Sequence, residues 1–106
     1  MKIFRGAATA LVTPFDHRGE VDFEVWEQLV KRQISSGISA LIVCGTTGEP
    51  STLTTDEKQR LISSAIRIAE GRLPVIAGTG GNNTKKVIED SIAAEDLGAD
   101  ALLIVT

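Results

Sequence analysis

The sequence predicts an α/β fold in which four parallel strands alternate with three helices. Four short apolar runs recur along its 106 residues, the first three ended by glycine or proline, and the segments between them repeat apolar residues at helical spacing. Uniformly apolar strands separated by amphipathic helices are typical of parallel sheets covered by helices. The run Gly37–Val43 is also echoed by Gly98–Ile104, 61 positions later. That distance fits two strand–helix units of about thirty residues each.

The first unit consists of a strand and a capped helix. Residues 7–13 form the predicted strand, which ends at Pro14. Asp22 is a suitable N-cap for the helix that follows, with Val21 and Trp26 placed as a hydrophobic staple around it. Gly37 ends this helix. Its apolar stripe is Phe23, Trp26, Leu29, Val30 and Ile34.

The second unit begins with a predicted strand over residues 38–44. Thr54 and Glu57 then have the spacing of a capping box, which predicts the start of a second helix. This helix ends near Gly71. Its apolar stripe is Leu61, Ile62, Ala65, Ile66 and Ala69.

The third unit repeats this pattern. We expect a strand over residues 74–78, a helix capped by Thr84 that ends at Gly98, and a fourth strand over residues 101–105. The pattern alone fits either a small doubly wound sheet or the first half of an eight-stranded barrel.

Composition excludes several classes of function. The net charge of −3 and the absence of a long basic run argue against a nucleic-acid surface. No apolar run approaches the ~18 residues of a membrane span. The single cysteine, Cys44, fits a reducing cytoplasm and a buried strand position. The single histidine, His17, has no second ligand nearby, so no metal site is expected.

The most informative segment is Gly45-Thr46-Thr47-Gly48-Glu49, which follows the apolar run of the second strand. Glycines allow a tight turn that brings the backbone close to a ligand. The two threonine hydroxyls can donate or accept protons. This combination is typical of a loop that presents N–H groups to a small anion.

This loop, with Ser51-Thr52-Leu53, Ala10–Phe15 and Pro74–Gly80, makes the chain resemble the pyruvate-dependent Schiff-base aldolases over its whole length. The paired threonines favour the branch that condenses pyruvate with aspartate semialdehyde, because sialic-acid lyases more often carry Ser-Thr there. The resemblance selects the barrel: residues 1–106 are then the N-terminal half of a (β/α)8 TIM barrel, a fold of ~250 residues.

The resemblance also implies roles for three residues. Thr46 corresponds to the catalytic proton-relay threonine, while Thr47 and Gly48 correspond to the binding site of the pyruvate carboxylate. Glu49 is expected to be structural, since a carboxylate would repel pyruvate. The Schiff-base lysine and the two tyrosines of the family are expected beyond Thr106, and we therefore expect this chain alone to be inactive.

Further expectations follow from the same resemblance. No cofactor is implied, and the full-length protein is expected to be a cytoplasmic homo-oligomer, either a dimer or a tetramer. Lysine inhibition is not expected, because Lys86 stands where lysine-inhibited members carry a glutamate; the other matching positions are Ser51, Thr55, Lys58 and Asn82. Two alternatives remain open: another pyruvate-dependent aldolase or hydratase, and an inert half-barrel that binds a carboxylate or assembles with a second half.

Overall fold

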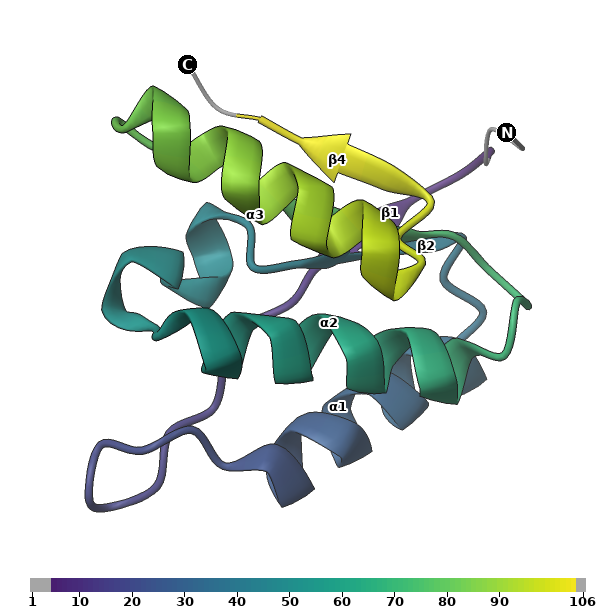
Figure 1. Ribbon diagram of the computed structural model, residues 1–106. Coiled ribbons are helices and arrows are strands. Elements are labelled where there is room, and N and C mark those ends of the chain that lie inside the picture. Colours follow the sequence, from purple (N-terminus) through teal and green to yellow (C-terminus); the bar gives the residue numbers. More distant parts are fainter. Residues whose placement is uncertain (1–4, 105–106) are drawn as a thin grey trace.

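A computed structural model describes residues 5–104 and shows four parallel strands connected by three helices (Figure 1). The strands are β1 (Ala8–Ala10), β2 (Ala40–Val43), β3 (Val75–Gly78) and β4 (Ala101–Leu103). The helices are α1 (Phe23–Ser35), α2 (Thr55–Ala69) and α3 (Thr84–Leu97). Two short 3-10 helices, η1 (Thr46–Gly48) and η2 (Pro50–Thr52), lie between β2 and α2. The predicted α/β class is confirmed.

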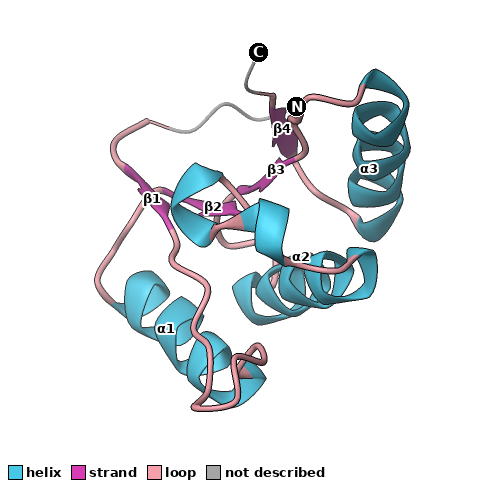
Figure 2. Ribbon diagram, turned by 90° about the vertical axis from the view of Figure 1, so that its left-hand side faces the viewer, coloured by secondary structure: helices cyan, strands magenta, loops and turns pink. Residues whose placement is uncertain are grey.

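The strand order distinguishes between the two architectures left open by the sequence. The sheet runs β1-β2-β3-β4, with Leu41 paired to Val75 and Ala77 to Leu102. Right-handed crossovers that all step in the same direction place every helix on the same face of a sheet. Figure 2 shows α1, α2 and α3 together on one side of the curved sheet. The arrangement is therefore an arc of a barrel, and the doubly wound alternative is wrong.

The core lies between this helical layer and the helix-facing side of the strands. Trp26 and Val30 of α1 and Leu61 of α2 are fully buried there. They pack in one cluster with strand residues, of which Leu41, Val43, Val75 and Ala77 are buried. Burial of this apolar surface is the main source of stability.

Local sequence signals set the helix ends. The Asp22 carboxylate accepts a hydrogen bond from the Val25 N–H at 3.1 Å, which confirms the predicted N-cap of α1. Thr54 and Glu57 form the complete capping box of α2. The predicted cap of α3 is wrong by one residue: Asn83, whose side chain accepts from the Lys86 N–H at 3.2 Å, is the N-cap in place of Thr84.

The strands are shorter than predicted because the chain leaves the sheet early. β1 ends at Ala10, although the Leu11 N–H still donates to the Ile42 carbonyl. β2 ends at Val43 since Cys44 adopts a left-handed backbone. β3 begins after Pro74, and β4 ends at Leu103; the predicted end of that strand, residue 105, lies outside the described residues.

Candidate functional site

The candidate site is the turn that follows β2. Cys44 has a φ of 60°, which is uncommon for a residue with a Cβ, and it directs the chain out of the sheet. The 3-10 helix η1 then carries Thr46, Thr47 and Gly48, and Glu49 (φ 56°) links it to η2. The turn therefore stands at the carboxyl ends of the parallel strands, where ligands bind in open α/β sheets and in barrels.

Hydrogen bonds inside the turn decide which donors remain for a ligand. The Gly48 N–H donates to the Gly45 carbonyl at 2.8 Å, and the Glu49 N–H donates to the Thr46 carbonyl at 3.1 Å. Within residues 5–104 the backbone N–H groups and hydroxyls of Thr46 and Thr47 have no hydrogen-bond partner, and both residues are exposed. The donors available to an anion are therefore those of the two threonines, whereas buried Gly48 shapes the turn.

A cavity of about 340 Å³ lies beside this turn. Its size suits a small-molecule site. Thr46 lines it, while Thr47 and Gly48 do not appear among its lining residues. The remaining lining residues come from the η2 start and the ends of three strands: Cys44, Gly45, Pro50, Gly78, Gly80, Gly81, Asn82 and Leu103.

Sequence reasoning did not place two residues at this cavity: Leu103 was not singled out, and Asn82 was expected only among the positions that match the lysine-inhibition site. Asn82 follows β3, and Leu103 is the last residue of β4. Their positions in the sequence could have identified them, because each lies at or just after the end of a strand. The carboxyl ends of neighbouring parallel strands meet at one edge of the sheet. Asn82 brings an amide that can donate to a carboxylate.

The loop after β3 contributes glycines to the cavity but not its threonine. Thr79 is buried, and its hydroxyl accepts a hydrogen bond from the Ser91 hydroxyl of α3 at 2.8 Å. This contact gives Thr79 a structural role between the end of β3 and α3.

Glu49 acts through its backbone. Its carbonyl accepts from the Thr52 N–H at 3.1 Å and from the Thr52 hydroxyl at 2.8 Å. No ion pair involves Glu49 in the part of the chain that the structure describes. Its left-handed conformation joins η1 to η2, which supports the expectation of a structural residue.

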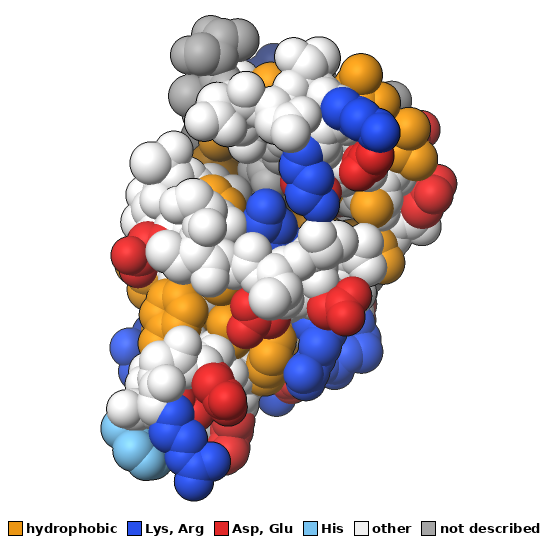
Figure 3. All heavy atoms as spheres, turned by 60° about the vertical axis from the view of Figure 1, so that its left-hand side comes forward, with side chains coloured by type: hydrophobic (Ala, Val, Ile, Leu, Met, Phe, Trp, Pro, Cys, Tyr) orange, Lys and Arg blue, Asp and Glu red, His pale blue; other side chains and the backbone are white. Residues whose placement is uncertain are grey.

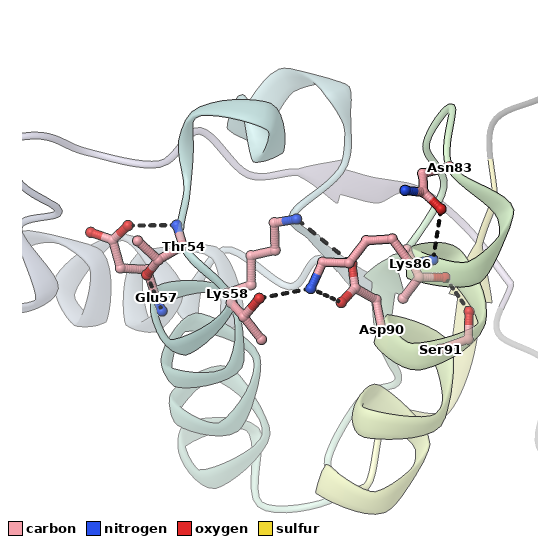
Figure 4. A network of polar contacts seen from close by, with 9 residues as sticks. Thr54, Glu57, Lys58, Asn83, Lys86, Asp90 and Ser91 are labelled. Atoms are coloured by element: carbon pink, nitrogen blue, oxygen red, sulfur yellow. Dashed lines mark hydrogen bonds and ion pairs between the residues drawn. The ribbon is translucent and has the colours of Figure 1, made fainter.

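A second cavity, of about 210 Å³, lies between η2 and the start of α3 and is lined by two lysines. The Lys86 ammonium contacts Asp90 at 3.1 Å and the Thr55 hydroxyl at 2.7 Å, and the Lys58 ammonium lies 3.7 Å from the same Asp90 (Figure 4). One carboxylate thus serves two cations. Figure 3 shows basic side chains in a hollow that is bordered largely by backbone and uncharged side chains.

Burial favours the neutral form of the Cys44 thiol. Burial raises the pKa of Cys44 from 9.0 to about 12, with Lys58 lowering it and Asp90 raising it to smaller extents. The thiol is therefore neutral at pH 7. Because the pKa of Cys44 in the folded state lies above its unfolded value of 9.0, the contribution of this group to stability is fully present below pH 9. It is lost as the pH rises towards 12.

We expect Cys44 to react with a disulfide-exchange reagent at least about tenfold more slowly in the native chain than in the urea-unfolded chain at neutral pH, because burial raises its pKa and lowers the thiolate fraction. Cys44 is the only cysteine, so absorbance of the released thiol reports on it alone. Equal rates in the two states would contradict its burial.

Within residues 5–104, no group of three or more His, Cys, Asp or Glu side chains is arranged to hold a metal ion. None of the helices in that range has the length and apolar character needed to span a bilayer.

The sequential sheet, the one-sided helices and the turn at the strand ends define this chain as part of a TIM-barrel protein. The model of the dihydrodipicolinate synthetase family matches residues 3–106. The chain belongs to that family.

Among the relatives, the 4-hydroxy-tetrahydrodipicolinate synthase of Exiguobacterium sibiricum is 55% identical over 104 residues, covering 98% of this chain and 36% of the relative. The synthase of Thermotoga neapolitana is 52% identical over 104 residues, covering 98% and 35%. The chain thus spans about a third of the length of the curated relatives it matches.

Solved structures agree. Dihydrodipicolinate synthase of Thermotoga maritima is 48% identical with a TM-score of 0.93, covering 99% of this chain and 35% of the other. The Acinetobacter baumannii synthase, solved in complex with pyruvate, is 48% identical with a TM-score of 0.92, covering 95% and 35%. A Clostridium difficile protein solved with mannosamine is 33% identical with a TM-score of 0.88, covering 93% and 34%.

Proposed function

We propose that the chain is the pyruvate-binding, N-terminal half-barrel of a 4-hydroxy-tetrahydrodipicolinate synthase, which condenses pyruvate with aspartate semialdehyde in lysine and diaminopimelate biosynthesis. The observation that carries this proposal is the Thr46-Thr47 turn, whose donors are free beside a cavity of about 340 Å³. It gains support from the 48% identity to a synthase solved with pyruvate. Curated relatives that are 48% to 55% identical to the chain are 4-hydroxy-tetrahydrodipicolinate synthases, which favours the synthase over a sialic-acid-lyase-like activity.

The residues of this chain would bind and orient the keto acid. The Thr47 N–H and hydroxyl would donate to the carboxylate, and charge-assisted hydrogen bonds of this kind are short and strong. Thr46, which lines the cavity, would pass protons near the imine carbon, with its hydroxyl acting as both donor and acceptor. The Schiff-base lysine and the relay tyrosines would come from the rest of a cytoplasmic homo-oligomeric enzyme, dimeric or tetrameric.

Pyruvate titration of the ¹⁵N-labelled chain tests this function. We expect shift changes centred on the Thr46 and Thr47 amides, and Thr47→Val should weaken the response by about tenfold or more, since a hydrogen bond to a charged group contributes ~1.5–3 kcal/mol. Thr84→Val is the matched control, because Thr84 is exposed and lines neither cavity. Shifts confined to other parts of the chain would contradict the proposal.

We also propose that free lysine does not bind in the second cavity. A cationic ligand would meet the Lys58 and Lys86 ammonium groups there, and their shared partner Asp90 offers only one compensating charge. Titration with submillimolar lysine is expected to leave the Asn82 and Lys86 amide shifts unchanged, and Lys86→Glu should introduce a response. A wild-type response at these amides would contradict this expectation.

A further inference from the structure

Gly78, the last residue of β3, lies against the Cys44–Gly45 peptide, which leads into the turn that carries Thr46 and Thr47. A Cβ built on Gly78 would lie 2.7 Å from the Cys44 carbonyl carbon and 2.9 Å from the Gly45 nitrogen, and it would overlap the Cys44 carbonyl oxygen. All three atoms belong to the backbone, so no flexible side chain can swing away to relieve the overlap. Any side chain at position 78 must therefore move a strand or the turn.

β3 is held in place by pairing with a strand on each side. Gly78 pairs with Leu103 of β4, and the Thr79 N–H donates to the Leu103 carbonyl at 3.1 Å. β3 is also paired with β2 along Leu41–Val43. The turn is therefore the part that would shift.

The conformation of Cys44 explains why the contact is so close. Its φ of 60° is left-handed, and in this conformation the Cys44 carbonyl lies against Gly78 of β3. A left-handed backbone is unfavourable for a residue other than glycine, and it persists only where the surroundings hold it. Gly78 provides the space that this conformation needs.

The other end of the turn is held in the same way. A Cβ on Gly48 would lie 3.0 Å from the Thr13 hydroxyl oxygen and 3.2 Å from the Leu11 carbonyl oxygen. The turn that carries Thr46 and Thr47 is thus fixed between the residues that follow β1 and the end of β3.

We infer that Gly78 is a positioning residue: the missing side chain at the end of β3 admits the Cys44 carbonyl and so sets where the Thr46 and Thr47 donors stand. Gly78 acts through the Cys44–Gly45 peptide and needs no contact with a ligand. The position of the turn follows from geometry alone, while its consequence for pyruvate rests on the proposed function.

The test compares Gly78→Ala with Gly81→Ala in the ¹⁵N-labelled chain. Gly81 lines the same cavity, but a Cβ there would meet only Val87 at 3.7 Å, an ordinary contact. We expect Gly78→Ala to displace the amide signals of residues 44–49 and to weaken the pyruvate response by about tenfold or more, because misplaced donors lose charge-assisted hydrogen bonds. Gly81→Ala should leave the amide signals of residues 44–49 unchanged, and Thr84→Val, at a residue that lines neither cavity, should leave the pyruvate response unchanged.

A second variant covers the case in which Gly78→Ala does not fold. In Cys44→Gly/Gly78→Ala, glycine at position 44 can rotate the carbonyl away from the new Cβ. We expect this double variant to fold with a displaced turn and without the pyruvate response, whereas Cys44→Gly alone should keep the wild-type turn.

The outcomes separate the two claims. Wild-type turn signals in Gly78→Ala, or in the double variant, would overturn the positioning role whether or not pyruvate binds. If the turn signals are displaced in Gly78→Ala but the wild-type chain shows no response to pyruvate, the positioning role is supported. The same result counts against the proposed function.

Discussion

Trp26→Ala is expected to lower the free energy of unfolding by about 3–5 kcal/mol. Trp26 is fully buried where α1 meets α2, and its indole N–H donates to the Ser64 hydroxyl at 2.9 Å. Truncation would leave a cavity in the helical layer and remove this hydrogen bond. Since the free energy of unfolding of a domain is only ~5–15 kcal/mol, the variant would lose a large part of it.

Urea denaturation followed by far-UV circular dichroism measures this effect, because the only tryptophan is lost in the variant. Val25→Ala is the matched control: Val25 precedes Trp26 on the same helix but is 38% exposed. We expect the control to change stability by less than about 1 kcal/mol. A loss for Trp26→Ala as small as that of the control would show that α1 is not packed as described.

The elements that sequence predicted well are those set by local chemistry. Asp22 and the Thr54–Glu57 pair cap their helices because each side chain reaches a backbone N–H three residues away. The adjacent residues Asn83 and Thr84 are both of a capping type, so sequence alone could not choose between them. The placement of all three helices on one face of the sheet follows from the strand order, and no local sequence pattern specifies that order.

The parts of the site that sequence did not predict depend on contacts between distant segments. Cys44 has the sequence pattern of an ordinary strand residue, and the space for its carbonyl comes from the glycine at the end of β3, 34 positions later. The Gly48 N–H is consumed inside the turn, which requires the geometry of η1. Asn82 joins the cavity because β2 and β3 are neighbours.

Sodium borohydride treatment of this chain with pyruvate is expected to give no pyruvyl-lysine adduct by intact mass. A Schiff-base lysine needs its amine near the bound ketone in an apolar, converging site. Of the five lysines, Lys2 lies outside the described residues; none of the other four lines the cavity beside Thr46. These four, all on helices, are Lys31, Lys58, Lys85 and Lys86.

The Thermotoga maritima synthase, of which this chain matches 35%, is the positive control, since the Schiff-base chemistry implied for its family predicts an adduct there. If the chain itself gave an adduct, Lys58→Arg and Lys86→Arg would show whether the second cavity supplies the amine. Such an adduct would refute the expected inactivity, because the keto acid would then be bound covalently without any lysine from outside residues 1–106. If no adduct forms but pyruvate shifts the Thr46 and Thr47 amide signals, carboxylate binding and imine formation are separate steps. The turn would then provide the binding, whereas imine formation needs an amine that the turn does not hold.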